Sequence, residues 1–195
     1  MNNFWFSALL LGTLTCITLF SACEDDDMIT PGDDPEPCCE TAPINYEDLS
    51  AGTDFPNGST YTTQGQKFEV LDFTWSSGGI ATNGAVQIRN SNCLNPAGLE
   101  AQLNNVNTKP DLPANGVDCI SFKAVNKGGN LNLTINNDFI NFNEPSDIDG
   151  TTLGGVTIMA SGAKDVPGVW RFEGNITEFL VGGQELFVDD WCIGS

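Results

Sequence analysis

The most reactive side chains in this chain are seven cysteines, and the 195-residue sequence has no histidine. Cys16 and Cys23 lie near the N-terminus, and the other five are Cys38, Cys39, Cys93, Cys119 and Cys192. No Cys-x-x-Cys spacing is present, so these five indicate disulfides formed in an oxidising compartment rather than a zinc site. Because five is odd, one of them stays unpaired or bonds elsewhere. A redox role for the vicinal pair Cys38–Cys39 is the alternative.

Cys23 follows a mostly apolar run, Phe4–Phe20, and the pair of small residues Ser21–Ala22. This arrangement resembles the lipobox of bacterial lipoproteins, in which a peptidase cleaves directly before a lipidated cysteine. The resemblance implies that residues 1–22 are a signal peptide and that Cys23 carries the lipid anchor. An uncleaved anchor helix is the alternative, because the leader Met1–Asn3 lacks a basic residue.

Four acids, Glu24–Asp27, follow Cys23 directly. They look like the export signal of Bacteroidota lipoproteins that reach the outer face of the outer membrane; a solvated spacer is the alternative. The resemblance implies a protein anchored in the outer membrane and facing the cell exterior. Residues 23–42 combine acids with prolines and show no apolar periodicity, which predicts a disordered linker.

The charge balance and the missing histidine exclude several function classes. Asp and Glu number 26 against 7 Lys and Arg, and all seven basic residues lie after residue 42 together with most of the acids. This acidic surface argues against binding nucleic acid, which needs a basic face. Without histidine there is no serine or cysteine triad and no histidine-ligated metal catalysis. No paired-carboxylate array of the glycosidase type stands on one strand, so we expect no enzyme.

Residues 43–195 predict one all-β domain. Short alternating runs are separated by Gly, Asn and Asp, and no stretch sustains helical periodicity. The expected strands are Ile44–Glu47, Lys67–Trp75, Ala85–Arg89, Asp118–Ala124, Asn130–Ile135, Phe139–Phe142, Val156–Ala160, Val169–Phe172, Ile176–Val181 and Glu185–Ile193. Strands at this spacing predict a two-sheet antiparallel β-sandwich of the jelly-roll type.

The clearest pair of strands is Asp118–Ala124 and Asn130–Ile135, on either side of a turn at Lys127–Gly129. Their alternation directs Ile120, Phe122, Leu131, Leu133 and Ile135 toward the core. We also expect an irregularity at Leu71–Asp72 in the long aromatic strand.

The two ends of the domain, Ile44–Asp48 and Leu186–Trp191, carry a further resemblance. They are similar to the first and last strands of jelly-roll modules of the galactose-binding-like and carbohydrate-binding kind, whose two end strands are neighbours and whose acids often hold structural calcium. The resemblance implies a Ca²⁺ site made by Glu47 with Asp189 or Asp190; carboxylates that merely face solvent are the alternative.

If the end strands are neighbours, as that resemblance implies, Cys192 lies near Cys38 and Cys39. A bond there would close a loop of about 150 residues. Cys93–Cys119 is then the expected second bridge.

The expected function is a non-catalytic binding module, with carbohydrate as the leading ligand class. Side chains that could stack on sugar rings or bond hydroxyls are Tyr61, Trp75, Arg89, Trp170 and Trp191. The alternative for each aromatic residue is core packing. A structural or adhesive surface protein without a small ligand is the second hypothesis. The two hypotheses differ in one observable, because a sugar-binding platform needs exposed aromatic rings and a structural domain buries them.

Overall fold

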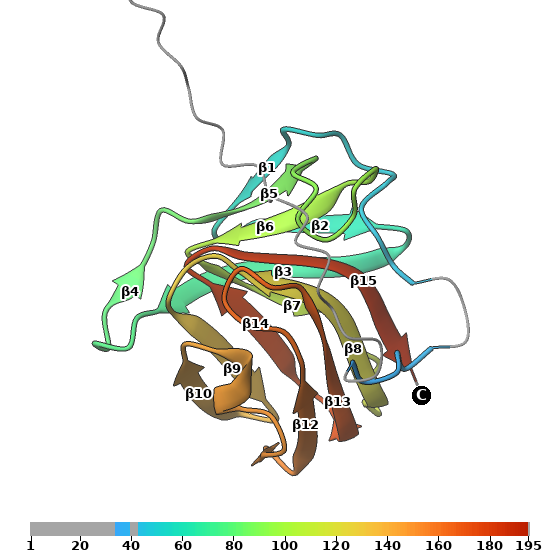
Figure 1. Ribbon diagram of the computed structural model, residues 1–195, viewed down its shortest axis with the longest axis vertical. Helices are drawn as coiled ribbons and strands as arrows, with labels where there is room; N and C mark the ends of the chain where they lie inside the picture. Colours follow the sequence, from blue (N-terminus) through green and yellow to red (C-terminus); the bar gives the residue numbers. More distant parts are fainter. Residues whose placement is uncertain (1–33, 40–42, 195) are drawn as a thin grey trace, which may run out of the picture.

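The computed structural model describes residues 34–39 and 43–194, so the expected signal peptide, Cys23 and most of the linker lie outside the described residues. Within them the chain forms two antiparallel β-sheets packed face to face, with one turn of 3₁₀ helix, η1 (Pro145–Asp147) (Figure 1). The predicted two-sheet antiparallel β-sandwich is therefore confirmed. In the part of the chain that the structure describes, no helix has the length and apolar character needed to span a membrane.

The first sheet has eight strands, and the C-terminal strand lies in its middle. In spatial order they are β1 (Asp54–Pro56), β5 (Ala85–Arg89), β6 (Glu100–Asn104), β15 (Leu186–Gly194), β8 (Val117–Asn126), β13 (Gly168–Ile176), β12 (Val156–Ala160) and β11 (Thr152–Leu153). The two edge strands, β1 and β11, are three and two residues long. Short edges limit pairing with other chains.

The second sheet has seven strands, one of which belongs to a hairpin that leaves the sheet. The order is β10 (Asp138–Phe142), β9 (Leu131–Ile135), β14 (Phe179–Gly183), β7 (Val106–Pro110), β3 (Gln66–Thr74) and β2 (Thr60–Thr63), with β4 (Ile80–Ala81) pairing only with the end of β3. Figure 1 shows the β3–β4 hairpin projecting from one side of the sandwich.

The core between the sheets is strongly aromatic. The ring of Phe122 lies at its centre, with centroid distances of 4.3 Å to Trp191, 5.6 Å to Trp170, 5.8 Å to Phe172 and 6.2 Å to Phe179. All five residues are at most 1% exposed. Aromatic side chains bury the most area per residue, so this cluster contributes much of the stabilisation of the fold.

Alternation predicted the inward residues correctly, but it did not predict which strands are neighbours. Ile120, Phe122, Leu131, Leu133 and Ile135 are all buried in the core. Their two strands, β8 and β9, nevertheless belong to different sheets, so these side chains meet across the core and the turn at Lys127–Gly129 carries the chain from one sheet to the other. The expected irregularity at Leu71–Asp72 is absent from the β3–β7 register.

The two ends of the domain lie side by side, as expected. Ile44 forms a reciprocal backbone pair with Trp191, with N–O distances of 2.7 and 2.8 Å. The indole Nε1 of Trp191 also donates to the hydroxyl of Tyr46 at 3.0 Å, in a fully buried position. From residue 43, where the description resumes, Ile44 forms an isolated bridge rather than the strand expected over Ile44–Glu47.

Replacing Phe122 should test the role of the aromatic cluster. We expect Phe122→Ala to lower the free energy of unfolding by about 3–5 kcal/mol, because the variant loses the ring's burial and leaves a cavity among four other rings. Urea denaturation followed by tryptophan fluorescence measures this directly. The matched control is Phe139→Ala, at a side chain that is 49% exposed. Equal losses in the two variants would contradict the assignment.

Candidate functional site

Three of the five side chains predicted to bind sugar lie in the core. Trp170 and Trp191 are 1% and 0% exposed and belong to the aromatic cluster. Tyr61 is 4% exposed, and its ring stacks between Phe55 and Phe68 at centroid distances of 4.8 and 5.1 Å. Burial raises the pKa of Tyr61 to about 12. These three rings cannot stack on a ligand, and the alternative of core packing holds for each of them.

The remaining two side chains, Trp75 and Arg89, are partly exposed but do not share a platform. Trp75 follows β3 in the seven-stranded sheet, and its ring meets the edge of Phe73 at a centroid distance of 5.1 Å. Arg89 ends β5 in the other sheet, where it lies 3.7 Å from the Asp54 carboxylate and 3.5 Å from the Gln102 side-chain oxygen. Because they belong to different sheets, the two do not form one sugar-binding surface.

Asparagine side chains on the outer face of the seven-stranded sheet hold the β3–β4 hairpin. Asn132 accepts a hydrogen bond from the amide of Thr74 and donates one to its carbonyl, at 3.0 and 2.8 Å, as a paired strand would. Asn130 accepts from the Ser76 amide at 3.1 Å, and Asn141 donates to the Thr74 carbonyl at 3.1 Å. These amides therefore satisfy backbone groups of the chain itself.

The acids expected to bind calcium make separate contacts. Glu47 accepts a hydrogen bond from the Leu99 amide at 2.7 Å, and a side chain at Gly98 would collide with its carboxylate. Asp190 forms an ion pair with Lys123 at 2.8 Å. Among the described residues no three acids, cysteines or histidines gather into a metal-binding group. Because calcium needs six to eight oxygen ligands, these side chains alone do not make a cage, and calcium stays a prediction.

Asp189 is an unusual carboxylate among the residues that the structure describes. It is fully buried, and no other side chain donates a hydrogen bond to either of its oxygens. The β15–β6 register places it across from Glu100, which is also fully buried and accepts hydrogen bonds from the amides of Cys93 and Leu94 at 3.0 and 2.7 Å. Burial, reinforced by the charges of Asp190 and Glu100, raises the pKa of Asp189 to about 7. This carboxyl therefore holds a proton in the folded state under mildly acidic conditions.

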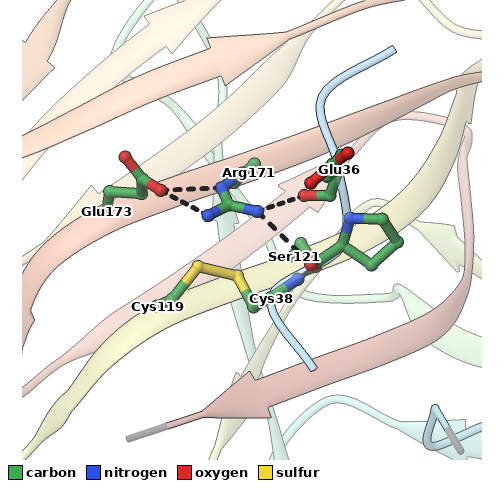
Figure 2. Close-up of polar contacts among 7 residues, drawn as sticks. Glu36, Cys38, Cys119, Ser121, Arg171 and Glu173 are labelled. Atoms are coloured by element: carbon green, nitrogen blue, oxygen red, sulfur yellow. Dashed lines mark hydrogen bonds and ion pairs between the residues drawn. A yellow bond between two sulfur atoms is a disulfide. The ribbon is translucent and has the colours of Figure 1, made fainter. Parts of the chain in front are cut away.

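A short N-terminal segment, residues 34–39, crosses the outer face of the eight-stranded sheet; we call it the crossing segment. Figure 2 shows the guanidinium of Arg171, on β13, between the Glu173 carboxylate and this segment. Arg171 donates to the carbonyls of Glu36 and Pro37, the latter at 3.3 Å, while its Nε donates to Glu173 at 2.9 Å. The guanidinium thus satisfies two carbonyls that no strand pairs.

Two disulfides fasten the end of the crossing segment to the sheet. Cys39 is bonded to Cys192 on β15, with a Cα–Cα distance of 5.4 Å, so the expected link between the vicinal pair and Cys192 is present. Cys38 is bonded to Cys119 on β8, with a Cα–Cα distance of 5.8 Å, and its amide donates to the Ser121 hydroxyl at 3.0 Å.

The expected bridge Cys93–Cys119 is therefore wrong, for a geometric reason. Cys93 packs against Val125 and Phe187, near the other end of β8. Val125 is six residues beyond Cys119, which corresponds to about 20 Å along a strand. A disulfide requires Cα atoms less than about 7 Å apart.

Arg171, Ser121 and Glu100 were not predicted as site residues from the sequence. Alternation places Arg171 and Ser121 on the outer face of the sheet, because the residues on either side of each of them are buried in the core. Their partners are backbone groups of the crossing segment, and no local pattern encodes that contact. Glu100 gives no signal beyond its charge, since an acid is ordinarily expected in water.

A comparison with protein-family models, curated proteins and solved structures found no match to this chain. The function is accordingly argued from the arrangement of its own residues.

The buried Asp189 should make stability depend on pH in a defined window. Because its pKa is raised in the folded state, it stabilises the fold at low pH, and this contribution is lost as pH rises from about 4 to about 7, by at most about 4 kcal/mol. We expect Asp189→Asn to be more stable relative to the native chain at pH 7.5 than at pH 4, in chemical denaturation at both values.

Asp147 provides a control of opposite sign. Hydrogen bonds from the amides of Asn143 and Glu144 lower the pKa of Asp147, so Asp147→Asn should lose stability at neutral pH and little at pH 3. A pH-independent difference between Asp189→Asn and the native chain would show that Asp189 does not titrate as inferred.

Proposed function

We propose that this chain is a lipoprotein anchored at Cys23 in the outer membrane, facing the cell exterior, and that its β-sandwich is a non-catalytic structural or adhesive domain. The observation that carries the proposal is the crossing segment, because this part of the predicted linker is covalently fastened to the two middle strands of a sheet. A domain that stays attached to a membrane through its N-terminal chain benefits from such a bond.

Burial of the aromatic residues supports the structural hypothesis over the carbohydrate-binding one. Trp170, Trp191 and Tyr61 stabilise the core instead of forming a platform. A hollow beside the crossing segment, lined by Pro37, Lys123 and Val169 among others, has a volume of about 220 Å³. Ligand pockets in proteins usually span about 300–1,000 Å³. The hollow is therefore smaller than the pockets that usually bind ligands, which argues against a glycan-binding site there.

Carbohydrate binding is retained as a second candidate at one position only. Trp75 is partly exposed on the β3–β4 hairpin, and Phe139 is 49% exposed on β10. Asn141, which shares the outward side of β10 with Phe139, bonds the carbonyl of Thr74 next to Trp75. A sugar ligand would use this outer face of the seven-stranded sheet.

Replacing the anchor cysteine tests the localisation. Cys23→Ala should release the protein from the membrane fraction and abolish incorporation of labelled fatty acid, because the acylated side chain is lost. Cys16→Ala is the matched control and should leave both unchanged. Protease treatment of intact cells should degrade the native chain if it faces the exterior. Membrane association of Cys23→Ala equal to that of the native chain would refute the lipid anchor.

A glycan array separates the two candidate functions. The structural hypothesis predicts no binding by the native chain, with calcium or with chelator. The carbohydrate hypothesis predicts binding that Trp75→Ala abolishes and that Arg89→Ala, on the other sheet, leaves intact. Binding that survives Trp75→Ala would contradict the assignment of the sugar to the hairpin face.

A further inference from the structure

The crossing segment contacts four adjacent strands of the eight-stranded sheet in their spatial order. Ser161, directly after β12, donates to the Asp34 carboxylate. Arg171 on β13 then holds the carbonyls of Glu36 and Pro37. The two cysteines that follow are bonded to β8 and to β15. The segment therefore runs across the strands, and it is bonded to β13, to β8, to β15 and to the residue that follows β12.

The covalent bonds fall on two strands in the middle of the eight-stranded sheet. β8 pairs with β15 on one side and β13 on the other, and β15 pairs with β6 and β8. Removing either strand means breaking hydrogen-bonded ladders on both of its sides and withdrawing core residues such as Phe122 and Val188, both at most 1% exposed. Strands of this kind belong to the most stable part of a fold.

We propose that the crossing segment bears mechanical load, and that its two disulfides deliver tension from the N-terminal chain to β8 and β15 and away from the edge of the sandwich. Tension applied before Asp34 first loads the contacts to Ser161 and Arg171, which are noncovalent. It then reaches Cys38 and Cys39, where it divides between two covalent bonds into the middle of the sheet.

Without the two disulfides the same tension takes a weaker path. It passes along the backbone to the single bridge of Ile44 with Trp191 and then to β1, which is three residues long and pairs only with β5. An edge strand of this kind is removed one hydrogen bond at a time, so it opens at low force. The disulfides convert unzipping from the edge into the extraction of central strands.

The bond between Cys39 and Cys192 also joins the two ends of the domain covalently. The two cysteines are 153 residues apart in the sequence, and an extended chain of that length spans about 500 Å. While the bond is intact, tension between the two ends of the domain cannot extend any of this length.

The role of the load path in the cell rests on the proposed function, in which the N-terminal chain attaches the domain to a membrane. The mechanical resistance of the purified protein does not depend on that attachment. The test below uses purified protein and gives the same result whether or not Cys23 carries lipid. A failure of the lipid anchor and a failure of the load path are therefore distinguishable.

Single-molecule pulling on the full chain tests the inference. One handle is attached at Thr30, ahead of the crossing segment, and the other at Ser77 in the β3–β4 turn. The native, oxidised chain should unfold in one high-force event. A variant with all four cysteines of the two bonds replaced by alanine (Cys38, Cys39, Cys119 and Cys192) should lose that event and open in several steps at lower force.

Two controls separate the load path from general stability. Arg171→Ala removes the guanidinium contacts and keeps both disulfides, so it should retain the high-force event. Val86→Ala lowers stability in the core, at a residue with 0% exposure, and should also retain it. If the four-cysteine variant does not fold, two variants that each keep one of the two bonds, Cys38→Ala with Cys119→Ala and Cys39→Ala with Cys192→Ala, should each lower the force of this event. An unchanged high-force event after the bonds are removed, or its loss in Arg171→Ala, would overturn the inference.

Discussion

The position of β15 in the middle of the eight-stranded sheet is the constraint on which the rest of the structure depends. The last strand of the chain pairs with β6 and β8, and its side chains Leu186, Val188 and Trp191 complete the core. The sheet cannot close until the C-terminal residues arrive, so most stabilising contacts join residues far apart in sequence. Folds built from such contacts form slowly. Fixing β15 with the disulfide from Cys39 to Cys192 therefore secures the element whose loss would divide the sheet.

A bulge in β15 sets the chemistry of both sides of this strand. The register with β8 shifts between Asp189 and Cys192, and Asp190 adopts a left-handed conformation with φ of 51°. The extra residue lets Val188 and Trp191 both face the core while Asp189 and Cys192 face outward. One carboxyl is thereby placed across from Glu100 without a partner, and one thiol is placed under the crossing segment. An aspartate suits the bulge because a short polar side chain tolerates a positive φ.

Both outer faces of the sandwich are crossed by the chain's own backbone. The crossing segment lies on the eight-stranded sheet, and the β3–β4 hairpin is held over the seven-stranded sheet by Asn130, Asn132 and Asn141. In both places polar side chains on strands bond backbone groups that no strand pairs, as buried polar groups require. Arg171 and these asparagines are residue types that ligand-binding sites also use, but here they bond the chain's own backbone. Because they are bonded to the hairpin, these asparagines are not free to bind a ligand.

The sequence by itself determined the fold class and which residues point inward, because alternation with a period of two is a local property of each strand. Phe122 and Leu133 were placed in the core on that basis, and both are buried. Cysteine content similarly indicated disulfides. Only the tertiary structure decided which strands are neighbours, that Cys119 meets Cys38 rather than Cys93, and that Trp170 and Trp191 belong to the core rather than to a binding surface. These outcomes depend on contacts between residues far apart in the chain, such as the 81 residues that separate Cys38 from Cys119, and alternation carries no information about partners at such distances.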